Sequence, residues 1–462
     1  MDSFVARQAI FDRDLNVWRY ELLFRSGFSD QYDAQDGDSA TVSVIANSLF
    51  EPGFEKLLHG RKATVNFDRS LLVSELCRDL PLPPDTVIEV LETVEPDDEV
   101  LAACRSLRER GYLIALDDYT GDLRLDPLLD VADLLKIDVL AIPPGLQLDI
   151  LQRARARGIL TIAEKVETRE EWERARDAGY DYFQGFFFAE PVVLAAQQIP
   201  ATTHSALSLI REMQAPDLDF GRVEELIKRE VGFSHRLLRY LNSPIFHFPS
   251  PVSSIRQALV LLGEREIRRW VTLASFSRLG SGKPLELVTQ SMVRGRFCEM
   301  VGRESGLPPN VDAFLLGVFS LLPALLDRPM AQLLDELALA PELSAPLRGS
   351  APPDDRLAEI LRLARAWESG DWEAVRSITA ALEISTVAVG QAYIEAVYWA
   401  DSIAAESAGP GWRPANSAGP ARAPVTASHA RPSAEGCQPG LKPWHFTCIH
   451  ILGWYVKLSV RI

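Results

Sequence analysis

The stretch GYLIALDDYTGD, residues 111–122, decides how this chain is interpreted. Its apolar run from Tyr112 to Leu116 predicts a short buried strand that ends on two adjacent carboxylates, Asp117 and Asp118. Neighbouring strand residues point to opposite faces, so both acids can serve one site only where the strand gives way to a loop. Carboxylates at the end of a parallel strand are typical of α/β barrel sites, and paired oxygens suit divalent cations. A turn in which Asp caps the next helix is the simpler alternative, and it is favoured for this stretch taken alone.

Strands and helices alternate on both sides of this stretch. The runs that predict strands are residues 4–12, 17–25, 63–67, 86–92, 112–118, 134–140, 160–167 and 180–185. Amphipathic runs between most of them predict crossover helices, which implies a parallel sheet. The strands are nearly continuous apolar runs, as expected when both faces of a sheet are covered. Their number over residues 1–200 favours a closed (β/α)8, TIM-like barrel over an open sheet.

The periodicity changes from about Thr202, where apolar residues recur at helical spacing and strand alternation stops. Residues 201–405 therefore predict a second, all-α domain. Residues 406–462 are rich in Pro, Ala, Gly and Ser, and we expect them to be disordered. The ending WHFTCIHILGWYVKLSVRI, residues 444–462, is either a membrane-surface or partner segment or an extension of the reading frame without selected structure. The second alternative is favoured because the ending matches neither the acidic domains nor a helical moment.

Composition excludes several classes of protein. A hydrophobic content of 47% with 24% charged residues is ordinary for a soluble globular chain. The net charge of −16 argues against nucleic acid or an anionic membrane as a partner of the whole surface. No run of about 18 apolar residues predicts a membrane span, and the first residues lack a signal-peptide pattern. The five scattered cysteines contain no CxxC pair, which argues against a disulfide framework or a thiolate zinc site and favours the cytoplasm.

Polar side chains interrupt the apolar strands, mostly near their carboxyl ends. They are Glu21, Asn66, Glu92, Asp117, Asp118, Lys136, Glu164 and Gln184. One barrel mouth would collect them, and such an acid-rich ring could hold two metal ions that clamp a phosphodiester while a base activates water. The alternative is that each strand simply exits into a polar loop. That explains one or two positions but not Lys136, because a lysine inside an apolar run is rarely buried without a carboxylate partner.

With these residues in place, the first 200 residues resemble an EAL domain, the cyclic di-GMP phosphodiesterase fold. The signature corresponds to Glu21-Leu22-Leu23, and Arg25 closes the run. The resemblance implies metal ligands for Mg²⁺ or Mn²⁺ at Glu21, Asn66, Glu92, Asp117 and Asp118. It implies catalytic roles for Lys136, Glu164 and Gln184, and substrate binding by Arg25. Glu167 matches a second acid, and Gly185 and Pro191 match the end of the pattern.

The chain departs from the EAL pattern in the loops more than in the strands. Leu22 replaces the family's Ala, Leu91 precedes Glu92 where the family has Thr, and the segment after Arg25 lacks the family's substrate-contacting loop. Residues 119–122 differ from the FGxGxSS loop of active members, and Lys165 replaces a Gly in the AExVE motif. A lysine beside bound cations disfavours metal occupancy.

Residues 237–271 resemble an HDOD domain, a relative of the HD phosphohydrolases that lacks their metal-binding His-Asp pair. No adjacent His-Asp occurs in this chain, and a packing or capping role is favoured for His204, His235 and His247. A barrel followed by an HDOD domain is the order of the YuxH-like EAL-HDOD signalling proteins, whose EAL part is commonly degenerate.

Two functions follow from these resemblances. The first is signal transduction by a degenerate EAL domain that binds cyclic di-GMP weakly or not at all, with a protein partner on HDOD residues 233–270. The second is a working phosphodiesterase that converts cyclic di-GMP to linear pGpG. The first is favoured because a misplacement of about 1 Å at a two-metal site can cost on the order of 100-fold in rate. The short join at residues 199–204 predicts that the domains touch, and a dimer is allowed.

Overall fold

The computed structural model gives a description of most of the chain. The residues described are 3–26, 60–74, 85–187, 201–215, 217–229, 254–279, 283–308, 311–337 and 339–408, together with Leu58, Cys77, Leu82, Pro83, Leu237 and Val252. Of the tail predicted at residues 406–462, the first three residues belong to the last described helix, and the rest lies outside the described residues. All the described residues belong to one compact unit.

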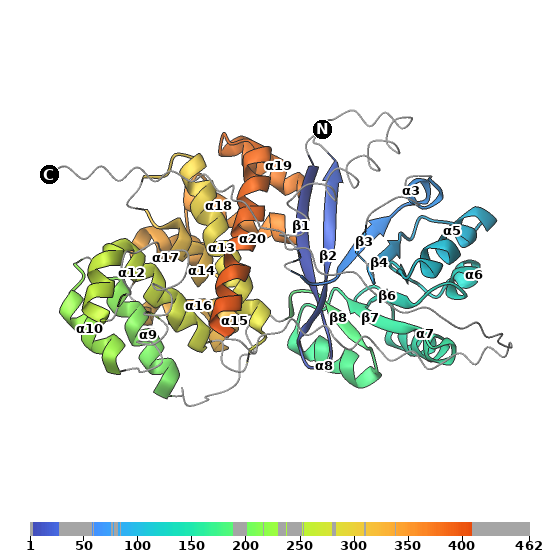
Figure 1. Cartoon of the computed structure of the whole chain (residues 1–462), viewed down its shortest axis with the longest axis horizontal. Coiled ribbons are helices and arrows are strands. Elements are labelled where there is room, and N and C mark those ends of the chain that lie inside the picture. The colour runs from blue at the N-terminus through green and yellow to red at the C-terminus, as the bar shows by residue number, and fades with distance from the viewer. Residues whose placement is uncertain are drawn as a thin grey trace, which may run out of the picture. The chain divides into compact units, whose positions relative to one another are not determined.

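Eight strands close into the expected barrel (Figure 1). They are β1 (Ser3–Phe11), β2 (Val17–Ser26), β3 (Ala63–Phe67), β4 (Val87–Val90), β5 (Leu113–Leu116), β6 (Leu134–Asp138), β7 (Leu160–Glu164) and β8 (Tyr182–Gln184). Strands β2 to β8 run parallel in chain order, whereas β1 pairs antiparallel with both β2 and β8. The reversal of β1 follows from the short turn to β2, because only antiparallel neighbours can be joined by a tight hairpin. The prediction of a TIM-like barrel is confirmed.

The hairpin turn is held by one aspartate. The Asp12 Oδ1 atom accepts hydrogen bonds from the backbone N–H groups of Asp14 and Asn16, at 2.9 and 2.8 Å. Leu15 takes a left-handed conformation with φ of 62°, which turns the chain back within four residues. The DRDLN sequence supplies Asp and Asn where such turns favour them.

Crossover helices cover the outside of the parallel strands. They are α3 (Arg69–Val73), α5 (Asp98–Glu109), the 3₁₀ turn η1 (Leu123–Leu125), α6 (Asp126–Leu129), α7 (Pro144–Arg157) and α8 (Arg169–Ala178). Their ends are fixed locally: Asp97 caps α5, and Thr168 and Glu171 form a reciprocal capping box at α8. The inner face of α5 buries Val100 and Leu107, so the amphipathic pattern of the sequence becomes the packing of helix on barrel.

All regular structure described after residue 200 is helical, as expected. The helices are α9 (Ala201–Met213), α10 (Phe220–Arg229), α12 (Ile255–Leu279), α13 (Leu285–Glu304), α14 (Ala313–Phe319), α15 (Leu322–Leu326), α16 (Met330–Leu337), α17 (Pro341–Arg348), α18 (Arg356–Ser369), α19 (Trp372–Ala381) and α20 (Thr386–Ala408). Helix α12 kinks at Gly263, where φ is 72°. None of the described helices combines the length and apolar character needed to cross a bilayer.

The helical region and the barrel share one hydrophobic core through β1 and helices α13, α18 and α20 (Figure 1). Trp367 of α18 is fully buried, and its indole N–H donates to the Val5 carbonyl of β1 at 3.2 Å. Arg7 of β1 makes a two-pronged ion pair with Asp401 of α20, at 2.7 and 3.0 Å. The barrel and the last helix are therefore joined by directional contacts as well as by apolar packing.

Removing the Asp401 carboxylate tests how much this junction contributes to stability. The Arg7 side chain is only 4% exposed, so Asp401→Ala would leave a guanidinium buried without that counter-charge. We expect the free energy of unfolding in urea to fall by about 3 kcal/mol. The matched control is Glu173→Ala, which breaks the exposed Arg169–Glu173 pair and should change stability by less than about 0.5 kcal/mol. A loss below about 1 kcal/mol for Asp401→Ala would contradict the role of this pair.

Candidate functional site

Lys136 lies at the centre of the barrel and is surrounded by carboxylates. Its side chain is 2% exposed, and β6 carries it into the barrel interior. The ammonium nitrogen Nζ lies 2.8 Å from Glu89, 2.8 Å from Glu164 and 2.9 Å from Asp117, and 3.4 Å from Glu21. A buried lysine needs such partners, as the sequence indicated. We call these five residues, with Asn66 and Gln184, the acidic ring.

The ring sits one layer above a small apolar cluster inside the barrel. The cluster consists of Ile10, Val87, Ala115, Leu134 and Ile162, all fully or almost fully buried. Side chains two positions apart on a strand share a face, so the next inward position on each parallel strand belongs to the layer above. The resulting pairs are Val87 and Glu89, Ala115 and Asp117, Leu134 and Lys136, and Ile162 and Glu164. The apolar layer closes the barrel floor, and the polar layer faces its carboxyl-end mouth.

Glu92 does not belong to the ring, and Glu89 occupies the place that we expected for it. Strand β4 ends at Val90, and Glu92 is exposed in the turn that follows. The two glutamates are three positions apart, so strand alternation alone prevents both from facing inward. Glu89 is two positions from Val87 on β4, so both side chains face the barrel interior, and Glu89 is completely buried. The sequence analysis passed over Glu89 because it lies inside an apolar run. Strand alternation counted from Val87 would have placed Glu89 on the inward face.

Two amide side chains hold Glu21 in place from opposite sides. The Asn66 amide donates to Glu21 Oε1 at 2.8 Å, and the Gln184 amide donates to Glu21 Oε2 at 2.5 Å. Gln184 also donates to Gln8 of β1 at 2.9 Å, a contact that the sequence did not predict. The EAL-like signature residue is thus fixed by strands β3 and β8, with β1 behind them.

Gly185 allows β8 to approach β7 closely at this level. Its φ of 144° and the nearby Val166 backbone leave no room for a side chain, because a Cβ would lie 2.0 Å from the Val166 carbonyl oxygen. The Val166 N–H donates to the Gln184 carbonyl at 3.0 Å, which sets Gln184 beside Glu164. A glycine is therefore required after Gln184 for the ring to close.

The ring leaves three buried oxygen atoms without a hydrogen-bond donor. They are Asn66 Oδ1, Glu89 Oε1 and Gln184 Oε1. Buried acceptors are normally satisfied, so these oxygens indicate room for a donor or a cation. Carboxylate and amide oxygens are the ligands that Mg²⁺ and Mn²⁺ prefer, and the donor set fits them in kind. The Lys136 ammonium, however, occupies the centre of the ring. Among the described residues, no three His, Cys, Asp or Glu side chains are grouped so that they could hold a metal ion.

Burial and the charges of the ring itself together set the pKa values of its members. Burial lowers the pKa of Lys136, but the surrounding carboxylates, Glu164 foremost, outweigh it and raise that pKa well above its usual range. Burial and the Glu21 charge raise the pKa of Glu89 well above its ordinary value. Burial, opposed by Lys136, raises the pKa of Glu164 to about 7. For Glu21, burial is outweighed by Lys136 and the amide hydrogen bonds, and its pKa is lowered. Lys136 is therefore a fixed cation and Glu21 a fixed anion.

Asp118 stands apart from the ring and is paired with Lys165. The two side chains are 3.3 Å apart, and Lys165 also pairs with Asp138 at 2.6 Å. Both Asp118 and Lys165 have left-handed backbones, with φ of 41° and 56°. That conformation favours glycine and is tolerated by Asp and Asn, so Lys165 is the unusual residue of the pair.

The remaining expected site residues lie elsewhere. Arg25 belongs to β2, but its side chain is outside the described residues, as is Pro191. Glu167 is exposed, and its backbone N–H donates to Glu171 at the start of α8. It therefore serves the helix start and does not reach the ring.

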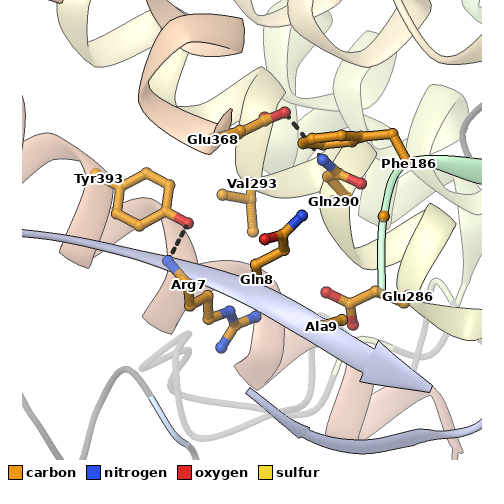
Figure 2. Close-up of a pocket in the computed structure, with 10 residues that line it drawn as sticks. Arg7, Gln8, Ala9, Phe186, Glu286, Gln290, Val293, Glu368 and Tyr393 are labelled. Atoms are coloured by element: carbon orange, nitrogen blue, oxygen red, sulfur yellow. Dashed lines mark hydrogen bonds between the residues drawn. The ribbon is translucent and has the colours of Figure 1, made fainter. Parts of the chain in front are cut away.

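The middle of β1 meets the helical region at a small pocket, shown in Figure 2. Gln8 lines it together with Glu286 and Gln290 of α13. The Gln290 amide donates to Glu368 of α18 at 2.9 Å. One side chain, Gln8, therefore touches both the ring, through Gln184, and the pocket at the helices.

Comparison with known proteins agrees with this architecture. Residues 63–191 match the EAL domain and residues 199–327 match the HDOD domain. YuxH of Bacillus subtilis is 34% identical over 412 residues, which cover 87% of this chain and 99% of YuxH. The cyclic di-GMP phosphodiesterase CdgJ of Vibrio cholerae is 34% identical over 405 residues, which cover 87% of this chain and 93% of CdgJ. A solved structure of Klebsiella pneumoniae BlrP1 with calcium and cyclic di-GMP has 25% sequence identity to this chain. The match covers 41% of this chain and 56% of the BlrP1 chain, with a TM-score of 0.35.

Both relatives span nearly the whole of their own length in these alignments, and the two matched domains follow one another in the expected order. The chain belongs to the family of YuxH and CdgJ, in which an EAL domain is followed by an HDOD domain.

Proposed function

We propose that this chain is a cyclic di-GMP signalling protein whose barrel binds the nucleotide at the acidic ring and whose helical region carries partner contacts. The observation that carries the proposal is the buried ring of oxygen donors around Lys136, with three oxygens that lack a donor. The name of CdgJ, which is similar over almost its full length, supports this choice of ligand.

In this proposal Glu21, Asn66, Glu89, Asp117 and Asp118 would hold Mg²⁺ or Mn²⁺. When bound, the cations would neutralise phosphodiester charge and lower the pKa of bound water. Glu164 and Gln184 belong to the same ring, and Lys136 supplies a positive charge at its centre. Arg25 remains our candidate for a phosphate contact, because a guanidinium matches phosphate bidentately.

Binding without efficient hydrolysis is the activity that we favour. Lys165 neutralises Asp118, and Lys136 already occupies the oxygens of four carboxylates. Both ammonium groups compete with a metal ion for the same ligands. Hydrolysis to linear pGpG is the second candidate, favoured by the completeness of the ring once Glu89 is counted in it.

Partner contacts are assigned to the helical region because α12 exposes apolar side chains. Val260 is 76% exposed and Leu261 is 43% exposed, and both fall within the surface expected at residues 233–270. The rest of that surface lies partly outside the described residues. The cytoplasm is the compartment that we propose, since Cys77, Cys104 and Cys298 are free, buried thiols.

Glu89→Gln and Glu92→Gln form a matched pair that tests the nucleotide site. Glu89 is in the ring, so replacing its carboxylate should weaken cyclic di-GMP binding in Ca²⁺ at least about tenfold. Lys136 keeps three other carboxylates, so the variant should still fold. Glu92→Gln should bind like the parent, because Glu92 is exposed in a turn. Isothermal titration calorimetry measures the affinity of both variants. Equal affinities would show that cyclic di-GMP does not bind at the acidic ring.

Lys165→Asn tests whether Lys165 limits metal use. Asparagine removes the charge beside Asp118 and tolerates the left-handed backbone at this position. We expect Mn²⁺ affinity to rise several-fold and any turnover of cyclic di-GMP, followed by separating the linear from the cyclic product, to increase. Lys165→Arg keeps the charge and should behave like the parent. A Lys165→Asn protein with unchanged Mn²⁺ affinity would show that this residue does not suppress the metal site.

A further inference from the structure

A cavity of about 300 Å³ lies beside the acidic ring at the barrel mouth. We call it the mouth cavity. From the barrel it is lined by Leu23, Phe24, Asn66 and Asp68, and from the helical region by Gly370 and Trp372. Asn66 is a member of the ring, so the mouth cavity and the ring are continuous at this side chain. Gly370 ends α18 and Trp372 is the first residue of α19, and we call residues 369–372 the α18–α19 turn.

This turn is fixed firmly against the barrel. Gly370 has φ of 70°, and a Cβ placed on it would lie 3.1 Å from Leu23 Cδ1, so the turn is seated directly on β2. The Trp372 ring packs edge-on against Trp367, with centroids 5.3 Å apart. Trp367 in turn is hydrogen-bonded to the Val5 carbonyl of β1. The Trp372 indole is therefore held in place relative to the ring before any ligand binds, which reduces the ordering cost of binding.

The lining of the mouth cavity fits a flat heteroaromatic group. Phe24 and Trp372 supply aromatic surface from opposite parts of the chain, Leu23 adds apolar surface, and Asn66 and Asp68 supply polar atoms. A mainly apolar wall with a few polar groups is the usual composition of a small-molecule pocket, and about 300 Å³ is the lower end of the usual volume. Any nucleobase can stack on such aromatic side chains, because every base has a π face.

We propose that one guanine base of cyclic di-GMP occupies the mouth cavity and stacks on Trp372, with its phosphates toward the acidic ring. The inference rests on the proposed function and deepens it, because it makes the α18–α19 turn a wall of the nucleotide site. Residues 369–372 lie beyond both segments that match known domains, which end at residues 191 and 327. The helical region would then sense the nucleotide by direct contact.

Trp372→Leu and Trp372→Phe separate stacking from simple packing. Leucine keeps apolar volume but has no π face, so the dissociation constant for cyclic di-GMP in Ca²⁺ should rise about tenfold. Phenylalanine keeps a ring and should stay within about threefold of the parent. Calorimetry gives the affinities, and the melting temperature of each variant shows that the fold is retained. Trp372→Phe provides a second measurement that does not depend on the leucine variant: tryptophan emission that the nucleotide quenches in the parent should be quenched less in this variant.

The controls distinguish this inference from the proposed function. If Glu89→Gln loses affinity while Trp372→Leu binds like the parent, the base does not stack on Trp372 and the proposed function stands. Equal quenching in the parent and in Trp372→Phe would overturn the inference in the same way. If the parent itself shows no binding of cyclic di-GMP with Ca²⁺, the proposed function fails, and the stacking inference fails with it.

Discussion

A lysine ammonium buried among four carboxylates is the interaction on which the rest of this structure depends. Four strands each bring one acid to Lys136, at distances between 2.8 and 3.4 Å. Desolvating so many like charges would be prohibitive without a central cation. Burial, together with the neighbouring carboxylates, raises the pKa of Glu89, Glu164 and Asp117 in spite of Lys136. In the function that we propose, a bound divalent cation would supply further positive charge to the ring.

Much of the fold could be predicted from local patterns, and the reason is physical. The hairpin turn, the buried strands and the helical second half each depend on residues close together in sequence. Lys136 was located because a charge inside an apolar run needs a partner. Glu89 was missed, and Glu92 chosen instead, because strand ends are the least certain part of any pattern and a shift of one position reverses which side chains face inward.

Contacts between distant segments could not be read from such patterns. Arg7 and Asp401 are 394 positions apart, and no sequence motif around either residue predicts that they pair. The same is true of Gln8, which supports Gln184, and of Trp372, which reaches the barrel mouth from the last third of the chain. Only the packing of helices on β1 and β2 brings Asp401 to Arg7 and Trp372 to the barrel mouth.

Strands β1 and β2 connect the two halves through pairs of adjacent residues. Arg7 bonds to α20 while its neighbour Gln8 bonds to Gln184 of the ring. Tyr20 donates to Glu286 of α13 at 2.8 Å while its neighbour Glu21 faces Lys136. Alternation on a strand sends successive side chains to opposite faces, so two short segments serve both the ring and the helices. A displacement of α13 or α20 would reach the ring through these positions.

The pairing of β1 with the final helices also constrains the order in which the protein can mature on the ribosome. Arg7 is made 394 positions before its counter-charge Asp401 on α20, and the indole of Trp367 is also made long after β1. Until α18 and α20 are made, the face of β1 that turns away from the barrel interior lacks the Trp367 indole and the Asp401 carboxylate. The Arg7 guanidinium and the Phe4 ring that Trp367 later covers would stay open to solvent during that interval, the stage at which partly folded chains are prone to aggregate.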